Sequence, residues 1–139
     1  MARLRYLADT SVFARLAKPQ VTAVFAPLAV EGRVGLCAPV SFELGYAARS
    51  TDDYHALRDR LSSFPLAPTT DGDHHRALDV QAELAERGQH RALSLVDALV
   101  AAVAEARGLV VLHYDADFEL VAGVTGQEQE WVVPRGTAD

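Results

Sequence analysis

In this 139-residue chain, five acidic residues lie at positions where a carboxylate is unusual and calls for a chemical or structural explanation. They come from four separate segments and are Asp9, Glu43, Asp97, Asp115 and Asp117. Carboxylates that lie close together repel one another, so such a cluster is stable only with protons or cations between them. All-oxygen ligation suits Mg²⁺ or Mn²⁺, which keep bound waters and accept phosphate oxygens. If the five acids converge, we expect a divalent-metal site that hydrolyses phosphodiesters through a metal-activated water.

Three of these acids lie at the ends of predicted strands. Asp115 and Asp117 follow the apolar run 109–112, which is typical of a parallel strand buried on both faces, and Asp9 ends the first predicted strand. Ligands bind outside the carboxyl ends of the strands in an open α/β sheet, and we expect the first and fourth strands to lie side by side there. Asp is also a preferred helix N-cap, so one acid of the pair 115 and 117 could simply start the next helix.

The other two acids, Glu43 and Asp97, lie on the inward stripes of predicted amphipathic helices. The two stripes are Val40, Glu43, Leu44 and Ala47, and Leu93, Val96, Asp97, Val100 and Ala104. A buried unpaired charge costs several kcal/mol, so each acid needs a cation, a hydrogen-bond network or a raised pKa. Structural alternatives stay open, namely an ion pair between Glu43 and Arg49 and a capping box formed by Ser94 and Asp97.

The remaining pattern predicts an α/β fold with a central parallel sheet of four to five short strands flanked by helices. Predicted strands are 3–8, 34–38, 64–68, 109–112 and 130–133. Predicted helices are 12–17, capped by Thr10 or Ser11, then 20–30, kinked or split by Pro27, one that opens at Pro39, and 52–63, 71–87, 93–107 and 118–122. We expect one domain over residues 1–139, with a frayed tail at 134–139.

The composition limits the kind of partner. The net charge of −6, from 13 basic and 19 acidic residues, argues against a global basic field that grips nucleic acid. Without the five clustered acids, however, 14 acidic residues face 13 basic ones, so the excess is largely the cluster itself. The single cysteine, Cys37, has no partner for a disulfide, which is typical of a reducing compartment, and we expect it to be an unreactive core residue. No apolar run approaches a membrane span or a signal peptide, so a soluble cytoplasmic protein is expected.

Other chemistries lack their motifs. His74 and His75 have no second pair of ligands at zinc spacing, so we interpret both as solvated residues in the first turn of a helix. Neither a glycine-rich phosphate loop nor a dinucleotide-binding fingerprint occurs, and no serine lies in a Gly-x-Ser-x-Gly turn.

Four motifs, in this order and spacing, resemble the PIN domain, specifically the VapC toxins of bacterial VapBC toxin–antitoxin pairs. They are Ala8-Asp9-Thr10-Ser11, Glu43 on an early helix, Leu95-Val96-Asp97-Ala98-Leu99 and His113-Tyr114-Asp115-Ala116-Asp117-Phe118. The resemblance spans nearly the whole chain. It implies a PIN-like three-layer fold with helices on both faces of the sheet, and a Mg²⁺- or Mn²⁺-dependent endoribonuclease. It also implies a homodimer and neutralisation by a VapB-type antitoxin whose C-terminal segment lies over the site.

The resemblance also implies a role for each acid. Asp9 and Asp97 are expected as direct metal ligands, Asp115 completes the site, and Glu43 holds metal or water from the other side. Asp117 has a more variable role. Thr10 or Ser11 is expected to orient Asp9 or to contact phosphate.

Two groups of residues are candidates for contacts with RNA, with the antitoxin or with a second copy. Basic side chains that could meet backbone phosphates are Arg15, Lys18, Arg87 and Arg91. Apolar residues beyond what the core needs are Val21, Val24, Phe25 and Leu28.

Rival functions stay open at this point. A non-catalytic PIN module could use the acidic pocket to bind a partner. A phosphatase is disfavoured because Asp9-Thr10-Ser11 lacks a second Asp two places on. A receiver domain is disfavoured because Lys18, the only lysine, is not suitably placed.

Overall fold

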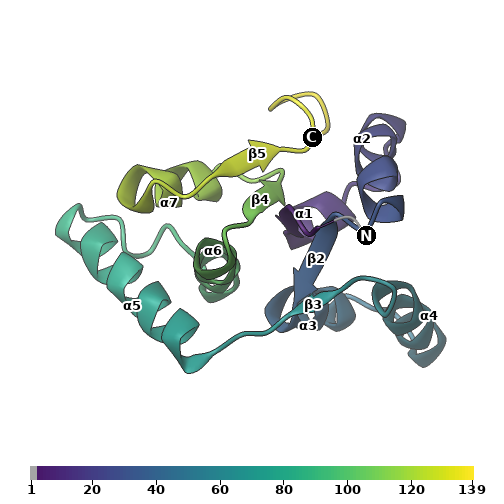
Figure 1. The fold of residues 1–139 in the computed structure, drawn as a ribbon, viewed down its shortest axis with the longest axis horizontal. Helices are drawn as coiled ribbons and strands as arrows, with labels where there is room; N and C mark the ends of the chain where they lie inside the picture. The colour runs from purple at the N-terminus through teal and green to yellow at the C-terminus, as the bar shows by residue number, and fades with distance from the viewer. Residues whose placement is uncertain (1–2) are drawn as a thin grey trace.

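The computed structural model describes residues 3–139, which form one sheet of five parallel strands in the order β3-β2-β1-β4-β5, with helices on both faces (Figure 1). The strands are β1 Tyr6–Ala8, β2 Val34–Cys37, β3 Leu66–Ala67, β4 Val110–His113 and β5 Gln129–Trp131. The helices are α1 Thr10–Phe13, α2 Pro19–Val30, α3 Ala38–Tyr46, α4 Thr51–Leu61, α5 Asp71–Glu86, α6 Leu95–Arg107 and α7 Asp117–Thr125. The predicted fold class is confirmed, and none of the helices described is long and apolar enough to cross a membrane.

The two central strands, β1 and β4, bring distant acids to one edge of the sheet. They pair in parallel, with Leu7 opposite Val111. The pairing continues one residue past β1, because the Asp9 N–H donates to the Leu112 carbonyl at 2.9 Å. The predicted adjacency of the first and fourth strands is therefore confirmed, and it fixes the residues that follow each strand beside one another.

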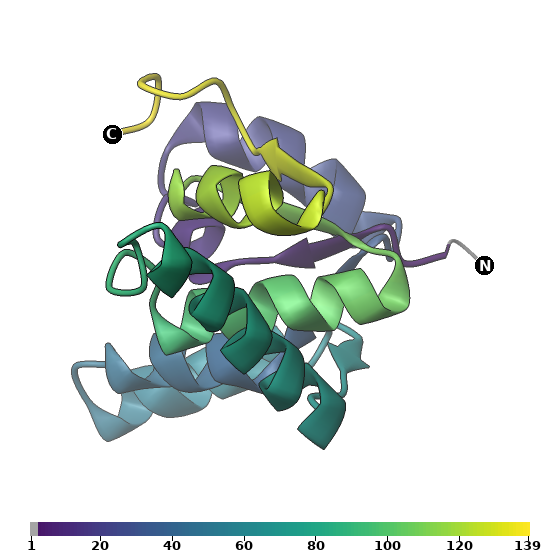
Figure 2. The same ribbon diagram turned by 90° about the vertical axis from the view of Figure 1, so that its left-hand side faces the viewer.

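Helix α6 is the most buried helix of the fold. Ser94 caps its start, and Gly108 ends it at a φ of 65°, a left-handed conformation that glycine adopts without steric cost. Every residue from Asp97 to Ala104 is buried. Figure 2 shows α5 packed over α6, which lies between α5 and the sheet. Because α6 is enclosed on several sides, an acid in its first turn is carried into a low-dielectric region.

Helix α2 covers the opposite face of the sheet (Figure 1), and the burial of its residues corrects one prediction. Val21 and Phe25 are buried in the core rather than surplus to it. The ring of Phe25 packs within 5.4 Å of Phe13 and 5.9 Å of Phe64, measured between ring centroids. Of the two predicted effects of Pro27, a kink or a split, the split does not occur, because α2 runs from Pro19 to Val30. Pro27 lies on the exposed side of α2, where water can reach the carbonyl that loses its partner.

The C-terminal tail is packed, so its predicted fraying is wrong. The Tyr114 hydroxyl accepts hydrogen bonds from the N–H groups of Gly136 and Ala138, at 2.8 and 2.9 Å, and donates to Asp139 Oδ1 at 2.8 Å. Arg15 Nε donates to the Ala138 carbonyl at 3.1 Å, and its guanidinium lies 4.5 Å from the centre of the Tyr114 ring. The tail is thereby held against α1 and the end of β4.

Two predictions about single residues are confirmed. Cys37 is buried and unpaired, and burial raises the pKa of its thiol to about 11, so it is inert core. His74 and His75 are exposed in the first turn of α5.

Candidate metal centre

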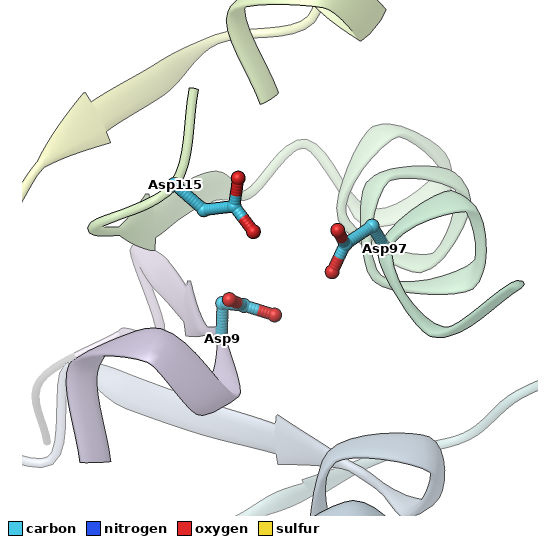
Figure 3. A group of neighbouring side chains, drawn as sticks. All are labelled: Asp9, Asp97 and Asp115. Atoms are coloured by element: carbon cyan, nitrogen blue, oxygen red, sulfur yellow. The ribbon is translucent and has the colours of Figure 1, made fainter. Parts of the chain in front are cut away.

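Three of the five predicted acids converge at the carboxyl edge of the sheet. Asp9, Asp97 and Asp115 each offer a carboxylate oxygen, and these oxygens lie within 4.8 Å of one another. Figure 3 shows the three carboxylates facing one common space, from the start of α1, the first turn of α6 and the turn that follows β4. Asp9 and Asp97 are buried and Asp115 is half-buried.

Asp9 is held by one carboxylate oxygen, which leaves the other free. Its Oδ2 accepts from the Ser11 N–H at 3.1 Å and from the Ser11 hydroxyl at 2.7 Å, so Asp9 itself, rather than Thr10 or Ser11, caps α1. Asp9 Oδ1 and Thr10 Oγ1 are buried without a hydrogen-bond partner within residues 3–139. A buried acceptor without a partner is costly, so Asp9 Oδ1 is available to a cation or a proton.

Asp97 is only partly explained by helix capping. Its N–H donates to the Ser94 hydroxyl at 3.1 Å, but in the described part of the chain its carboxylate returns no bond to the Ser94 backbone and faces the cluster instead. Burial, followed by the charges of Asp9, Asp115 and Asp117, raises the pKa of Asp97 to about 8. Burial also raises the pKa of Asp9, against the opposing effect of the Ser11 hydrogen bonds.

Asp115 and Asp117 have different surroundings. Asp115 Oδ1 accepts from the Asp117 N–H at 3.0 Å, which supports the start of α7, and Asp115 also offers an oxygen to the triad. Asp117 is half-buried and lies outside the triad. Its pKa is raised by burial and by the charge of Asp115. Helix capping and membership of the acidic group therefore coexist at Asp115.

Glu43 is not brought into the triad. It is half-buried on α3 and forms no ion pair with Arg49 or another base of the described chain. The predicted inward stripe is too long, because Val40 is buried but Ala47 is exposed where α3 ends. A role of Glu43 at the metal stays a prediction.

The predicted basic contacts lie in two segments. Arg15 is partly committed to the fold, because it bonds the carbonyls of Ser11 and Ala138. Lys18 is half-buried just before α2. Arg87 and Arg91 are exposed in the segment that leads into α6, whose first turn carries Asp97.

Residues 113 and 114 support the triad, and the sequence motifs alone assign them no role. The Tyr114 N–H donates to the Ser11 hydroxyl at 2.8 Å, and that hydroxyl in turn donates to Asp9. His113 is completely buried, and its Nδ1 lies 3.0 Å from the Asp115 backbone nitrogen. One signal could have marked His113, since it is a polar residue at the end of an otherwise apolar strand.

The donor set fits a hard divalent cation. It consists of carboxylate oxygens and includes a buried oxygen without a partner. The pKa values of Asp9 and Asp97 are raised by burial first and by neighbouring carboxylates second. Fold and site together define an α/β protein with an acidic centre at the carboxyl edge of a parallel sheet, with the geometry and ligand type that a divalent cation needs.

The chain belongs to the PIN-domain family, whose model matches residues 6–124. It is 48% identical over 136 residues to "Ribonuclease VapC51" of Mycobacterium tuberculosis, covering 98% of both chains. It is 38% identical over 134 residues to "Ribonuclease VapC18" of the same organism, covering 95% of this chain and 98% of the relative. These identities also show that it belongs to the VapC ribonuclease family, as the sequence motifs predict.

Solved structures show the same fold. The DNA-bound VapBC complex of Salmonella typhimurium matches with a TM-score of 0.76 at 22% identity, covering 94% of this chain and 99% of that one. The VapBC-5 complex of Mycobacterium tuberculosis matches with a TM-score of 0.60 at 26% identity, covering 94% and 97%.

Proposed function

We propose that this chain is a metal-dependent endoribonuclease that hydrolyses RNA phosphodiesters, with Mg²⁺ as its metal and Mn²⁺ as a substitute. The observation that carries the proposal is the convergence of Asp9, Asp97 and Asp115, with ligand oxygens within 4.8 Å, in a chain whose relatives are named ribonucleases. We also propose that residues 1–139 are a single PIN domain and that it acts in the cytoplasm.

The side chains of the site would have different roles in the reaction. The free oxygen of Asp9, with Asp97 and Asp115, would hold the metal, while Ser11 keeps Asp9 in place. When bound, the metal supplies positive charge for the phosphate oxygens and lowers the pKa of a water. Thr10, whose hydroxyl is buried without a partner in residues 3–139, would donate to a phosphate oxygen.

The outer residues act on the substrate from the rim. Glu43 and Asp117, which flank the triad in this proposal, would accept hydrogen bonds from the attacking water and fix its direction. Arg15, Lys18, Arg87 and Arg91 would contact backbone phosphates or the antitoxin. Without cations, the crowded carboxylates would repel the RNA backbone, so the cation matters for binding as well as for cleavage.

We also propose a VapB-type antitoxin partner and a homodimer. VapBC complexes are among the solved structures that share this fold. The surface carries large apolar side chains that the core does not use: Phe42 and Tyr46 on α3, Leu66 on β3 and Leu95 at the start of α6. Contiguous exposed apolar groups mark surfaces that a protein partner covers, and Phe42 and Leu66 line the same groove.

The test is cleavage of total cellular RNA by the purified, antitoxin-free protein with Mn²⁺, followed by mapping of the cut ends. We expect discrete products that disappear when a chelator is added. A folded protein that binds Mn²⁺ and yields no products with Mn²⁺ or Mg²⁺ would contradict the proposal and favour a non-catalytic PIN module that binds a partner through its acidic pocket.

A further inference from the structure

The backbone at the end of β4 supports two acids of the triad at once. The Tyr114 N–H donates to the Ser11 hydroxyl, which holds Asp9. One residue further on, the Asp115 N–H donates to His113 Nδ1 at 3.0 Å. The His113 ring thus holds the backbone of Asp115 by accepting its N–H, whereas the Ser11 hydroxyl holds the carboxylate of Asp9 by donating to it.

This contact defines the protonation of the His113 ring. A backbone N–H can only donate, so His113 Nδ1 must be an acceptor and the ring proton must be on Nε2. His113 Nε2 lies 2.5 Å from Gln129 Oε1, which accepts that proton. Gln129 therefore selects the tautomer in which Nδ1 has a free lone pair for Asp115.

The ring has little freedom to leave this position. It is fully buried, and the rings of Phe118 and Trp131 each lie 5.0 Å from it, between centroids. Gln129 is fixed by the pairing of β5 with β4, in which it lies opposite Val111. Two successive hydrogen bonds, from His113 to Gln129 and from the Asp115 backbone to His113, consequently link the edge strand β5 to the acidic cluster.

We propose that His113, set in its tautomer by Gln129, is a positioning residue that orients Asp115 toward the metal. The inference rests on the proposed function in one respect, the assignment of Asp115 as a metal ligand. Partners of this kind, one contact removed from the ion, typically change metal affinity by about 10- to 100-fold when they are replaced.

Two substitutions separate positioning from packing. His113→Leu keeps most of the side-chain volume but leaves the Asp115 N–H and Gln129 Oε1 without their partner, so we expect a lower Tm and an Mn²⁺ affinity about 10- to 100-fold weaker. His113→Asn leaves a cavity but places an amide oxygen near the position of Nδ1, so we expect a lower Tm and a largely restored Mn²⁺ affinity. Mn²⁺ alone is titrated calorimetrically against each purified full chain, with thermal unfolding measured in chelator.

A third variant keeps the imidazole. Gln129→Leu removes the acceptor for the Nε2 proton, so ¹⁵N NMR of His113 should change from a pure Nε2–H tautomer to a mixture, with weaker Mn²⁺ binding. This variant decides the question if His113→Leu does not fold. His75→Asn, on the exposed surface of α5, is the matched control for the His113 variants and should change neither Tm nor Mn²⁺ affinity.

Opposite results would overturn the inference. If His113→Leu binds Mn²⁺ as tightly as the wild type and His113→Asn binds it more weakly, the affinity depends on core packing, and His113 is a packing residue only. An Nδ1–H tautomer in the wild type, or a wild type that binds no Mn²⁺, would overturn it as well. A wild type that binds Mn²⁺ tightly through this network but cleaves no RNA would instead count against the proposed function.

Discussion

Replacing Asp97 with asparagine should abolish RNA cleavage and also make the metal-free protein more stable above pH 8. The amide cannot supply an anionic ligand, so the centre loses its hold on the metal. The gain in stability follows from the site itself, because Asp97 is buried and burial, with Asp9, Asp115 and Asp117 around it, raises its pKa to about 8.

The direction of the pH dependence follows from linkage. The pKa of Asp97 is higher in the folded chain, about 8, than the ordinary value of 3.8 for an aspartate. Its contribution to stability is therefore fully present below the unfolded pKa and is lost as pH rises through the folded pKa. At pH 9 the wild-type protein must keep a crowded carboxylate charged, whereas Asp97→Asn avoids this cost, which is on the order of a few kcal/mol.

Thermal unfolding in chelator at pH 6 and pH 9, with RNA cleavage in Mn²⁺ alongside, measures both effects. Asp97→Asn should raise Tm more at pH 9 than at pH 6, while Asp59→Asn, on the exposed surface of α4, should leave Tm and cleavage unchanged. Cleavage at the wild-type rate by Asp97→Asn would refute the mechanism. Equal changes in Tm at the two pH values would show that the charge of Asp97 does not destabilise the fold.

Tyr114→Phe should destabilise the protein by about 2–3 kcal/mol, because buried groups lose their partner. The hydroxyl accepts from two backbone N–H groups, those of Gly136 and Ala138, and donates to Asp139. Without it, the N–H of Ala138, a residue only 1% exposed, is left unpaired or the tail must detach. The backbone N–H of Tyr114 that supports Ser11 is unchanged, so folded protein should still cleave RNA.

Urea unfolding measures this loss as a shift in the free energy of unfolding. Tyr54→Phe is the matched control, since Tyr54 is exposed on α4 and its hydroxyl has no hydrogen-bond partner among the described residues. A change below about 0.5 kcal/mol for Tyr114→Phe, a size usual for surface substitutions, would show that the tail contacts do not hold.

The acids at strand ends were predictable because one topological rule governs them. Parallel strands present their carboxyl ends at one edge, so the residues after the buried runs, Asp9 and Asp115, had to meet once β1 and β4 were neighbours. Asp97 followed from helical periodicity, since an acid in the inward stripe of the most apolar helix is costly to bury unless it binds a cation or a proton.

Some features depend on tertiary contacts that no local pattern carries. The packed tail depends on the place of one hydroxyl, that of Tyr114, which sequence periodicity does not locate. Val21 and Phe25 were misjudged because the phenyl cluster that buries Phe25 also needs Phe64, from a distant segment. The inward stripe predicted around Glu43 was too long because it was extended to Ala47, where α3 has already ended.

The most direct test of the central claim is a crystal structure of the wild-type chain grown with Mn²⁺, with anomalous scattering used to locate the ion. We expect an anomalous peak between Asp9, Asp97 and Asp115, roughly 2.0–2.2 Å from a carboxylate oxygen of each. A peak elsewhere on the acidic surface, with no ion among these three carboxylates, would contradict a metal centre at the triad.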